Sequence, residues 1–284
     1  MESLTDINVI KNLLHRHGFS FARSLGQNFL INPSVCPRMA DACGCEQIGV
    51  LEIGPGVGVL TRELASRAKR VVAVEIDMRL KPVLAETLAG YDNVHILWDD
   101  LLKLNLADLI AAQFGDLPVC VCANLPYYIT SPILMQLLES RIPFTSIVTM
   151  VQKEAAQRIC APPGTRQCGA VSLAVSYFSQ PEVLLHVSKG SFLPAPKVDS
   201  AVISLTPHPN PPVNVDSEQQ FFALIRAAFN QRRKTLPNAV SAGLGIEKSR
   251  VLEALLGASI PQTARAETLT LSDFAKLSQQ LTVV

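Results

Sequence analysis

The sequence is short of charged residues and contains no long apolar run. Asp, Glu, Lys and Arg make up 17% of its 284 residues, against roughly 25% in an ordinary soluble protein. The longest apolar runs, such as residues 117–123, fall well short of the ~20 residues that a membrane-spanning helix needs. With 48% apolar residues and no membrane span, the chain is expected to form a globular protein with a packed core.

Paired cysteines and an excess of basic charge are also missing. None of the seven cysteines stands in a Cys-x-x-Cys spacing, so we expect reduced thiols in the core and no metal site. The first residues include Glu2 and Asp6 and lack the pattern of a targeting segment. These features favour a cytoplasmic protein. Because the net charge is only +1, any nucleic-acid surface must come from local clusters.

The apolar pattern predicts alternating strands and helices. A helix is expected over residues 6–15. Strand-like runs at 50–53, 71–76, 94–98 and 119–123 are separated by helix-length segments such as 60–68 and 80–89, and further strands are expected at 146–151, 182–187 and 200–205. Such alternation is typical of a parallel sheet covered by helices. We therefore predict an α/β fold with a doubly wound, seven-stranded Rossmann-like sheet, mostly parallel with an antiparallel last hairpin.

Four prolines at 207, 209, 211 and 212 interrupt this pattern. Proline in such density denies both helix and ladder pairing, and the chain beyond it is helix-like at 218–234, 248–256 and 272–281. The sequence thus predicts a ligand-binding catalytic domain over residues 1–206, in which residues 1–32 are an N-terminal extension that contributes to the ligand site. A small helical domain is predicted over residues 213–284.

A glycine-rich turn follows the first strand of the sheet. It reads Glu-Ile-Gly-Pro-Gly-Val-Gly-Val-Leu-Thr at 52–61, and glycine lets a backbone approach a ligand closely. Glu75, 21 residues beyond Gly54 at the end of the next strand, suits the hydroxyls of an adenosine ribose. A dinucleotide fingerprint is an alternative, but its third glycine comes one residue early, at Gly58, so the turn is more similar to that of S-adenosylmethionine enzymes. Asp100 is either an adenine ligand or an ordinary turn residue.

The fourth strand leads into Asn124-Leu125-Pro126-Tyr127-Tyr128. The amino nitrogen of adenine is a poor nucleophile because its lone pair is delocalised into the ring. An Asn oxygen and a backbone carbonyl can accept its two protons and favour a tetrahedral nitrogen. Pro126 stiffens such a loop, and Tyr127 offers a face for stacking, which is worth about 1–3 kcal/mol per base. A plain proline turn at a strand end is the alternative.

Several motifs occur together and in order, at residues 26–30, 52–61, 124–127, 152–154, 192–200 and 231–235. With them, the chain closely resembles the ribosomal RNA adenine dimethyltransferase family over nearly its whole length. The resemblance implies S-adenosylmethionine as the cofactor. It places the cofactor contacts on Gln27, Asn28, Leu30, Gly54, Gly56, Glu75, Ile76, Asp100, Leu101 and Asn124.

The same resemblance implies a target-base site and an RNA surface. Asn124 and the backbone of Leu125 would grip the amine beside Pro126, and Tyr127 and Phe192 would form aromatic walls around an extruded base. The expected RNA-binding residues are Arg226, Arg232, Arg233, Lys234 and Lys197. Pro237 departs from the basic or polar residue expected after this cluster.

The implied reaction is dimethylation of the N6 amines of two adjacent adenines near the 3′ end of 16S rRNA, on an immature 30S particle, by a monomer. A large-subunit rRNA methyltransferase that confers antibiotic resistance is the nearest alternative. A nicotinamide dehydrogenase is disfavoured by the Asn-Leu-Pro-Tyr loop. A role in ribosome assembly can coexist with the enzyme activity.

Overall fold

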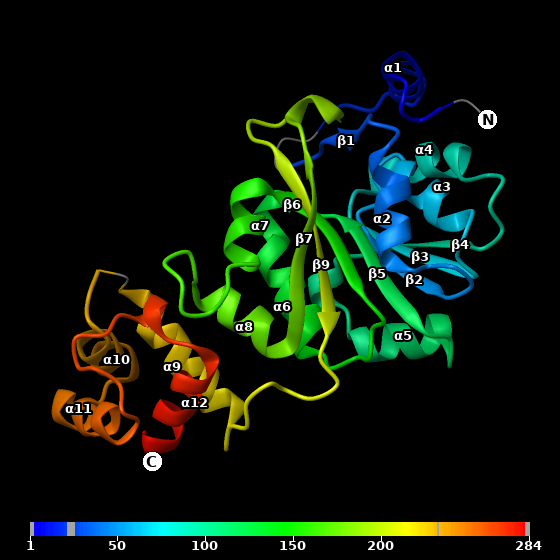
Figure 1. Ribbon diagram of the computed structural model, residues 1–284. Helices are drawn as coiled ribbons and strands as arrows, with labels where there is room; N and C mark the ends of the chain where they lie inside the picture. The colour runs from blue at the N-terminus through cyan, green and yellow to red at the C-terminus, as the bar shows by residue number, and fades with distance from the viewer. Residues whose placement is uncertain (1–2, 22–25, 232, 282–284) are drawn as a thin grey trace. The chain divides into compact units, whose positions relative to one another are not determined.

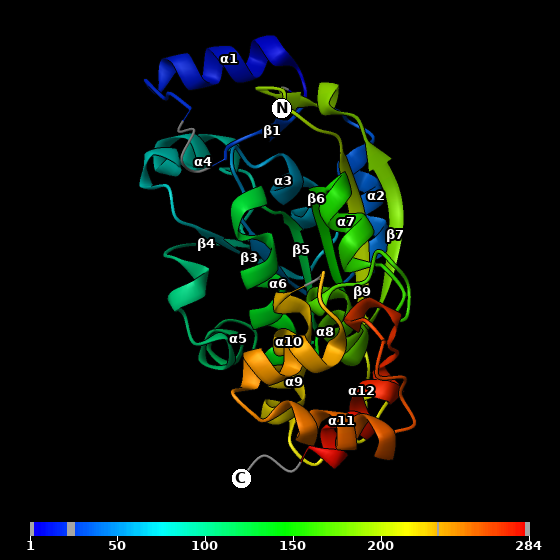
Figure 2. The same ribbon diagram turned by 90° about the vertical axis from the view of Figure 1, so that its left-hand side faces the viewer.

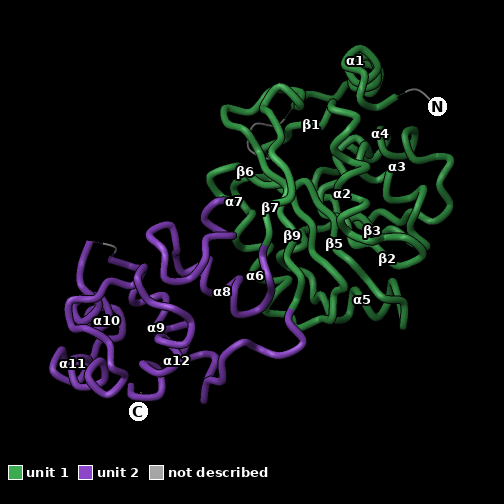
Figure 3. Tube along the Cα trace, viewed as in Figure 1, with its two compact units in different colours: residues 1–156, 182–207 green, residues 157–181, 208–284 purple. Residues whose placement is uncertain are grey.

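A computed structural model describes residues 3–21, 26–231 and 233–281 of the chain. The chain divides into two compact units (Figures 1 and 3), one made of residues 1–156 and 182–207 and the other of residues 157–181 and 208–284. Arg232, one of the predicted RNA-binding residues, lies outside the described residues. Among the described residues, no helix is both long and apolar enough to span a bilayer.

The centre of the fold is a seven-stranded sheet with the strand order β4-β3-β2-β5-β6-β9-β7. The first five of these strands pair in parallel, and β9 runs antiparallel to β6. The strands are β2 (Gly49–Ile53), β3 (Arg70–Glu75), β4 (Val94–Trp98), β5 (Val119–Asn124), β6 (Ile147–Gln152), β7 (Ser179–Val187) and β9 (Ser200–Pro207). The predicted seven-stranded α/β fold is confirmed, and the order reverses direction between β2 and β5.

Helices cover both faces of this sheet because its central strands are buried on each side. On one face α2 (Val35–Cys43) and α3 (Val59–Ala65) pack onto β2, β5 and β6 through a common core. In Figure 2, α6 (Thr130–Glu139) lies on the other side of the sheet from α2. Helices α5 (Leu106–Phe114) and α7 (Lys153–Ile159) follow β4 and β6. The turns between strands and helices therefore gather at the carboxyl ends of the parallel strands.

The N-terminal helix α1 (Ile7–Arg16) confirms the helix expected there. Asp6 caps it by accepting the backbone N–H of Asn8 at 2.7 Å, which satisfies a donor that the first turn leaves unpaired. Its buried face packs with the short helix η2 (Met78–Leu80) and with α4 (Lys81–Thr87) in a second apolar cluster. This contact ties the N-terminal extension to the turn that follows β3.

Residues 29–30 form a short strand that is not among the strands predicted from the apolar pattern. Strand β1 (Phe29–Leu30) pairs antiparallel with β8 (Phe192–Leu193), and Leu30 lies opposite Phe192. The short helix η5 (Lys189–Ser191) precedes β8. Two residues are too few for an alternating pattern to appear in sequence, so this pairing had no local signal.

The second unit is helical and includes a segment that the sequence had assigned to residues 1–206. Its elements are α8 (Ala170–Phe178), α9 (Glu218–Asn230), α10 (Leu236–Leu244), α11 (Lys248–Gly257), η6 (Ala266–Thr268) and α12 (Leu271–Gln280). Residues 157–181 group with it because Tyr177 and Phe178 stack against Phe221 and Phe222, with ring centroids 5.2–5.3 Å apart. The predicted division near the prolines places residues 157–181 with the sheet, whereas the contacts group them with the helical unit.

The helix predicted over 218–234 ends earlier, at Asn230, and a new helix begins after Thr235. Pro237 lies in the first turn of α10 and is buried. A proline suits this position because the first turn of a helix leaves its N–H groups unpaired in any case. Proline at position 237, in place of the basic or polar residue expected there, therefore favours the start of α10.

Candidate functional site

A cavity lies in the first unit at the carboxyl ends of the parallel strands, beside the point where the strand order reverses. Ligands of open α/β sheets bind at such points. All ten predicted cofactor residues line it, from Gln27, Asn28 and Leu30 through Gly54, Gly56, Glu75 and Ile76 to Asp100, Leu101 and Asn124. Leu125, Pro126 and Tyr127 line the same cavity. The roles assigned to these residues stay predictions, but the fold brings them together.

The glycine-rich turn contributes Gly54, Pro55 and Gly56 to the lining of this cavity. Gly54, Gly56 and Gly58 have φ values of +71°, +58° and +91°, a region in which other residues are strained. A Cβ atom on Gly56 would lie 3.1 Å from the ring of Phe29, whereas one on Gly54 would meet no protein atom within 4 Å. Space is therefore left beside Gly54, where a ligand can approach the backbone.

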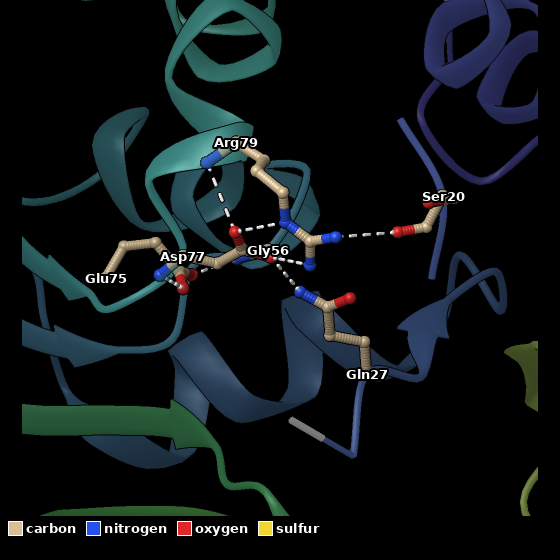
Figure 4. A network of polar contacts seen from close by, with 6 residues as sticks. All are labelled: Ser20, Gln27, Gly56, Glu75, Asp77 and Arg79. Carbon is tan, nitrogen blue, oxygen red and sulfur yellow. Dashed lines mark hydrogen bonds and ion pairs between the residues drawn. The ribbon is translucent and has the colours of Figure 1, made fainter. Parts of the chain in front are cut away.

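Glu75 is the last residue of β3 and lines the cavity. Its Oε1 accepts the backbone N–H of Asp77 at 2.8 Å, and its Oε2 accepts that of Gly56 at 3.4 Å (Figure 4). The side chain is buried, and burial raises its pKa, while the two backbone donors act in the opposite direction. The carboxyl group is thus held in one orientation with acceptor capacity left for a ligand.

Glu52, near the end of β2, is a second acidic residue that lines the cavity. It is 1% exposed, and neither its Oε2 nor the Oγ1 of Thr61 has a hydrogen-bond partner among the described residues. Burial, aided by the nearby Glu75, raises the pKa of Glu52 to about 8. A protonated carboxyl at neutral pH explains how this acid is tolerated in the core.

The raised pKa of Glu52 predicts a pH-dependent stability. Its ordinary value is 4.5, so its contribution is fully present below pH 4.5 and is lost as the pH rises towards 8. Between pH 5 and pH 8 the loss amounts to about 3 kcal/mol. We expect Glu52→Gln to remove this part of the pH dependence, as measured by urea unfolding of both proteins at the two pH values. Parallel stability profiles for the wild type and the variant would contradict it.

The Asn-Leu-Pro-Tyr loop leaves β5 at the edge of the cavity. The Nδ2 of Asn124 donates to the carbonyl of Asn28 at 3.4 Å, which leaves the amide oxygen as an acceptor. The hydroxyl of Tyr127 bonds to the Oγ of Ser200 at 2.8 Å, and burial raises the pKa of this tyrosine. The ring of Tyr127 is thereby held at the cavity, with its hydroxyl anchored in β9.

Asp100 starts the short helix η3 (Leu101–Lys103) and accepts the N–H of Leu102 at 3.1 Å. The Nε2 of Gln136, on α6, donates to the carbonyls of Leu101 and Leu104. This glutamine fixes the turn from another element, and the sequence analysis did not find it. Residues of the cavity lining that it missed include Cys36, Met39, Leu80 and Leu102. Their apolar or turn character carries no signal of a site.

Phe192, expected as an aromatic wall, is not among the residues that line the cavity. It is 3% exposed and packs in the core with Val35 of α2 and with Leu30, its partner in the β1–β8 pair. In the described structure its contribution is to support Leu30, which does line the cavity. In this structure its ring is therefore not at the cavity surface, where a base would contact it, and its role as an aromatic wall stays a prediction.

The predicted RNA-binding residues that the structure describes are exposed. Arg226 lies on α9, Arg233 and Lys234 lie between α9 and α10, and all three belong to the second unit. Lys197 lies between β8 and β9 in the first unit. Among the described residues, no group of three or more His, Cys, Asp or Glu side chains is arranged to hold a metal ion.

Comparison with known proteins agrees with this geometry. The family described as "Ribosomal RNA adenine dimethylase" matches residues 18–282. "Ribosomal RNA small subunit methyltransferase A" of Anoxybacillus flavithermus is 50% identical, over 95% of this chain and 94% of its own. The protein of the same name from Alkaliphilus metalliredigens is 45% identical over 99% of both chains.

Two solved structures share the fold. A dimethyladenosine transferase from Plasmodium falciparum has a TM-score of 0.72 at 28% identity, covering 88% of this chain and 95% of its own. The 23S rRNA methyltransferase ErmE has a TM-score of 0.68 at 26% identity, covering 89% and 99%. These likenesses confirm the resemblance expected from the motifs, and the nicotinamide dehydrogenase alternative finds no support. The chain belongs to the ribosomal RNA adenine dimethylase family.

Proposed function

We propose that the protein transfers methyl groups from S-adenosylmethionine to the N6 amines of two adjacent adenines near the 3′ end of 16S rRNA. The observation that carries this proposal is that the Asn-Leu-Pro-Tyr loop and the acids suited to adenosine meet in one cavity. Small-subunit enzymes at 44–50% identity support this substrate over the large-subunit RNA named for ErmE, which is 26% identical.

The cavity fits the proposed cofactor. A carboxyl group held by two backbone donors (Glu75) suits the ribose hydroxyls, and Asp100 suits the adenine amine. Ile76 and Leu102, which are 52% and 39% exposed, offer apolar surface to the adenine ring. The space beside Gly54 suits the remaining part of the cofactor, which supplies an electrophilic methyl group on a sulfonium.

The protein's own residues would orient the acceptor amine. The Oδ1 of Asn124 and the backbone carbonyl of Leu125 would each accept a hydrogen bond from one N–H of the amine. The nitrogen lone pair would then turn out of the plane of the ring, towards the methyl group. S-adenosylmethionine bound there would supply the methyl group, which would pass from sulfur to the amine nitrogen, and the cationic product would then lose its proton to water. Because no strong base is needed, positioning supplies most of the catalysis, an effect worth ~7–11 kcal/mol in well-oriented reactions.

The finer parts of the proposal concern the substrate particle and the cell. We propose that the target base is extruded from RNA in an immature 30S particle, at a cost of a few kcal/mol. We propose also that the protein acts as a monomer in the cytoplasm. Tyr127 is the aromatic side chain in the cavity that supports stacking of such a base.

The direct test is transfer of labelled methyl from S-adenosylmethionine to purified rRNA and to immature small subunits, followed by nucleoside analysis. Dimethyladenosine in small-subunit RNA is the expected product. Dimethyladenosine in large-subunit RNA would keep the chemistry and overturn the substrate. Label that appears in neither RNA, from a protein that binds the cofactor, would overturn the proposed reaction.

The exposed cations after α9 predict a salt-dependent grip on RNA. Replacing both Arg233 and Lys234 by Ala should weaken RNA binding at low salt. The slope of log K against log [salt] should fall by about 1.5, since each phosphate contact contributes about 0.7–0.9. Fluorescence anisotropy of a labelled rRNA fragment across a potassium chloride series measures both effects. Lys276→Ala, an exposed lysine on α12, is the control, and an equal fall for this variant would contradict the assignment.

A further inference from the structure

One buried carboxylate, that of Asp77, joins the N-terminal wall of the cavity (residues 26–28) to the turn after β3 (Figure 4). Asp77 is 5% exposed. Its Oδ2 accepts the Nε2 of Gln27 at 2.7 Å and the Nη2 of Arg79 at 2.6 Å, and its Oδ1 accepts the Nε of Arg79 at 2.8 Å. Gln27 lines the cavity, whereas Asp77 and Arg79 are not among its lining residues.

Arg79 extends this network to a second point on the N-terminal segment. Its Nη1 donates to the carbonyl of Ser20 at 3.3 Å, and its guanidinium lies 5.2 Å from the ring centroid of Phe19. Phe19 and Phe21 in turn pack against Phe29, with centroids 6.1 and 5.2 Å away. Residues on both sides of the segment 22–25 are thus held by one ion pair and one aromatic cluster.

The same network reaches the acid proposed to bind the ribose. The backbone N–H of Asp77 donates to the Oε1 of Glu75, while its side chain holds Gln27. Asp77 therefore contributes both to the orientation of the Glu75 carboxyl, which Gly56 also holds, and to the position of Gln27 in the cavity lining. Hydrogen bonds from Arg79 and Gln27 lower the pKa of Asp77, so its carboxylate stays charged at neutral pH.

We propose that Asp77 and Arg79 are positioning residues for the cofactor. They hold residues 26–28 in place at the cavity, so that both these residues and Glu75 can contact S-adenosylmethionine. This inference rests on the proposed function, because it requires the cavity to bind that cofactor. Neither residue touches the reacting atoms, and each acts through Gln27 or Glu75.

The proposal is tested by calorimetric binding of S-adenosylmethionine and S-adenosylhomocysteine to the full chain. Asp77→Asn is expected to raise Kd about 10- to 100-fold, the effect of losing one charge-assisted hydrogen bond. At saturating cofactor, kcat should stay within a few-fold of the wild type, so the change appears in KM. Hydrogen exchange of the amides at 26–29 should become faster in the variant before cofactor is added.

Two further variants separate positioning from general loosening. Arg79→Gln removes a half-exposed side chain and should raise Kd in the same direction, which keeps the test open if Asp77→Asn does not fold. Glu86→Gln is the matched control, because Glu86 pairs with Arg16 and His17 of the same N-terminal region but is not among the cavity-lining residues. It should leave Kd unchanged.

Unchanged affinity in folded Asp77→Asn and Arg79→Gln would overturn the positioning role alone. An equal loss in Glu86→Gln would also overturn it, because any loosening of the N-terminal region would then suffice. Wild-type protein that binds neither compound would overturn the proposed function itself, which is a distinguishable result.

Discussion

Replacing Asn124 by Ala is expected to lower the rate of methyl transfer by about 10²- to 10³-fold, the range found when one preorganised polar contact to a transition state is removed. The amide oxygen is proposed to accept an amine proton only when the target base is in place. Its amide nitrogen makes one long bond, at 3.4 Å, to the carbonyl of Asn28. Cofactor affinity should therefore change by no more than a few-fold.

Single-turnover transfer of labelled methyl at saturating RNA and cofactor measures this loss, and calorimetry with S-adenosylhomocysteine measures the binding. Asn124→Asp is the matched variant, because a carboxylate keeps the acceptor and loses the donor to Asn28. It should retain more activity than the alanine variant. A near-normal rate in Asn124→Ala, or equal losses in both variants, would contradict the role proposed for the amide oxygen.

Four of the predicted cofactor residues could be placed from sequence because each stands at or just after the end of a strand with a clear apolar pattern. Gly54 and Asp100 come after β2 and β4, and Glu75 and Asn124 are the last residues of β3 and β5. Parallel strands bring their carboxyl ends to one edge of a sheet, so residues far apart in the chain meet there once the strands are known. Once a parallel α/β sheet was predicted, these residues could be expected to lie together without any three-dimensional information.

Contacts that depend on register between distant segments could not be obtained in this way. Phe192 stands in one of the motifs that carry the family resemblance, at residues 192–200. Its pairing with Leu30, more than 160 residues away, nevertheless places it in the core. The bond from Gln27 to Asp77 spans 50 residues, and neither residue has a pattern that names the other. The packing of Tyr177 on Phe221 likewise moved residues 157–181 out of the unit that the linear pattern suggested.

Replacing Glu75 by Ala is expected to cause the largest loss of cofactor affinity. Two hydrogen bonds from ribose hydroxyls to a buried carboxylate contribute together about 3 kcal/mol or more, which is at least ~10²-fold in Kd. Glu75→Gln keeps one acceptor oxygen and should lose about tenfold. Calorimetry with S-adenosylhomocysteine separates these values, and Glu86→Gln again serves as an acid replaced outside the cavity lining.

The pH dependence of binding gives the same residue a second, independent readout. Burial raises the pKa of Glu75 in the free protein, whereas hydroxyl donors favour its ionised form. The complex should therefore have the lower pKa, so that binding releases a proton and affinity increases as the pH rises through the raised value. Calorimetry in buffers of different ionisation enthalpy detects that proton. In Glu75→Gln the proton release should disappear, and its persistence would assign the titration to another group and remove Glu75 from the ribose site.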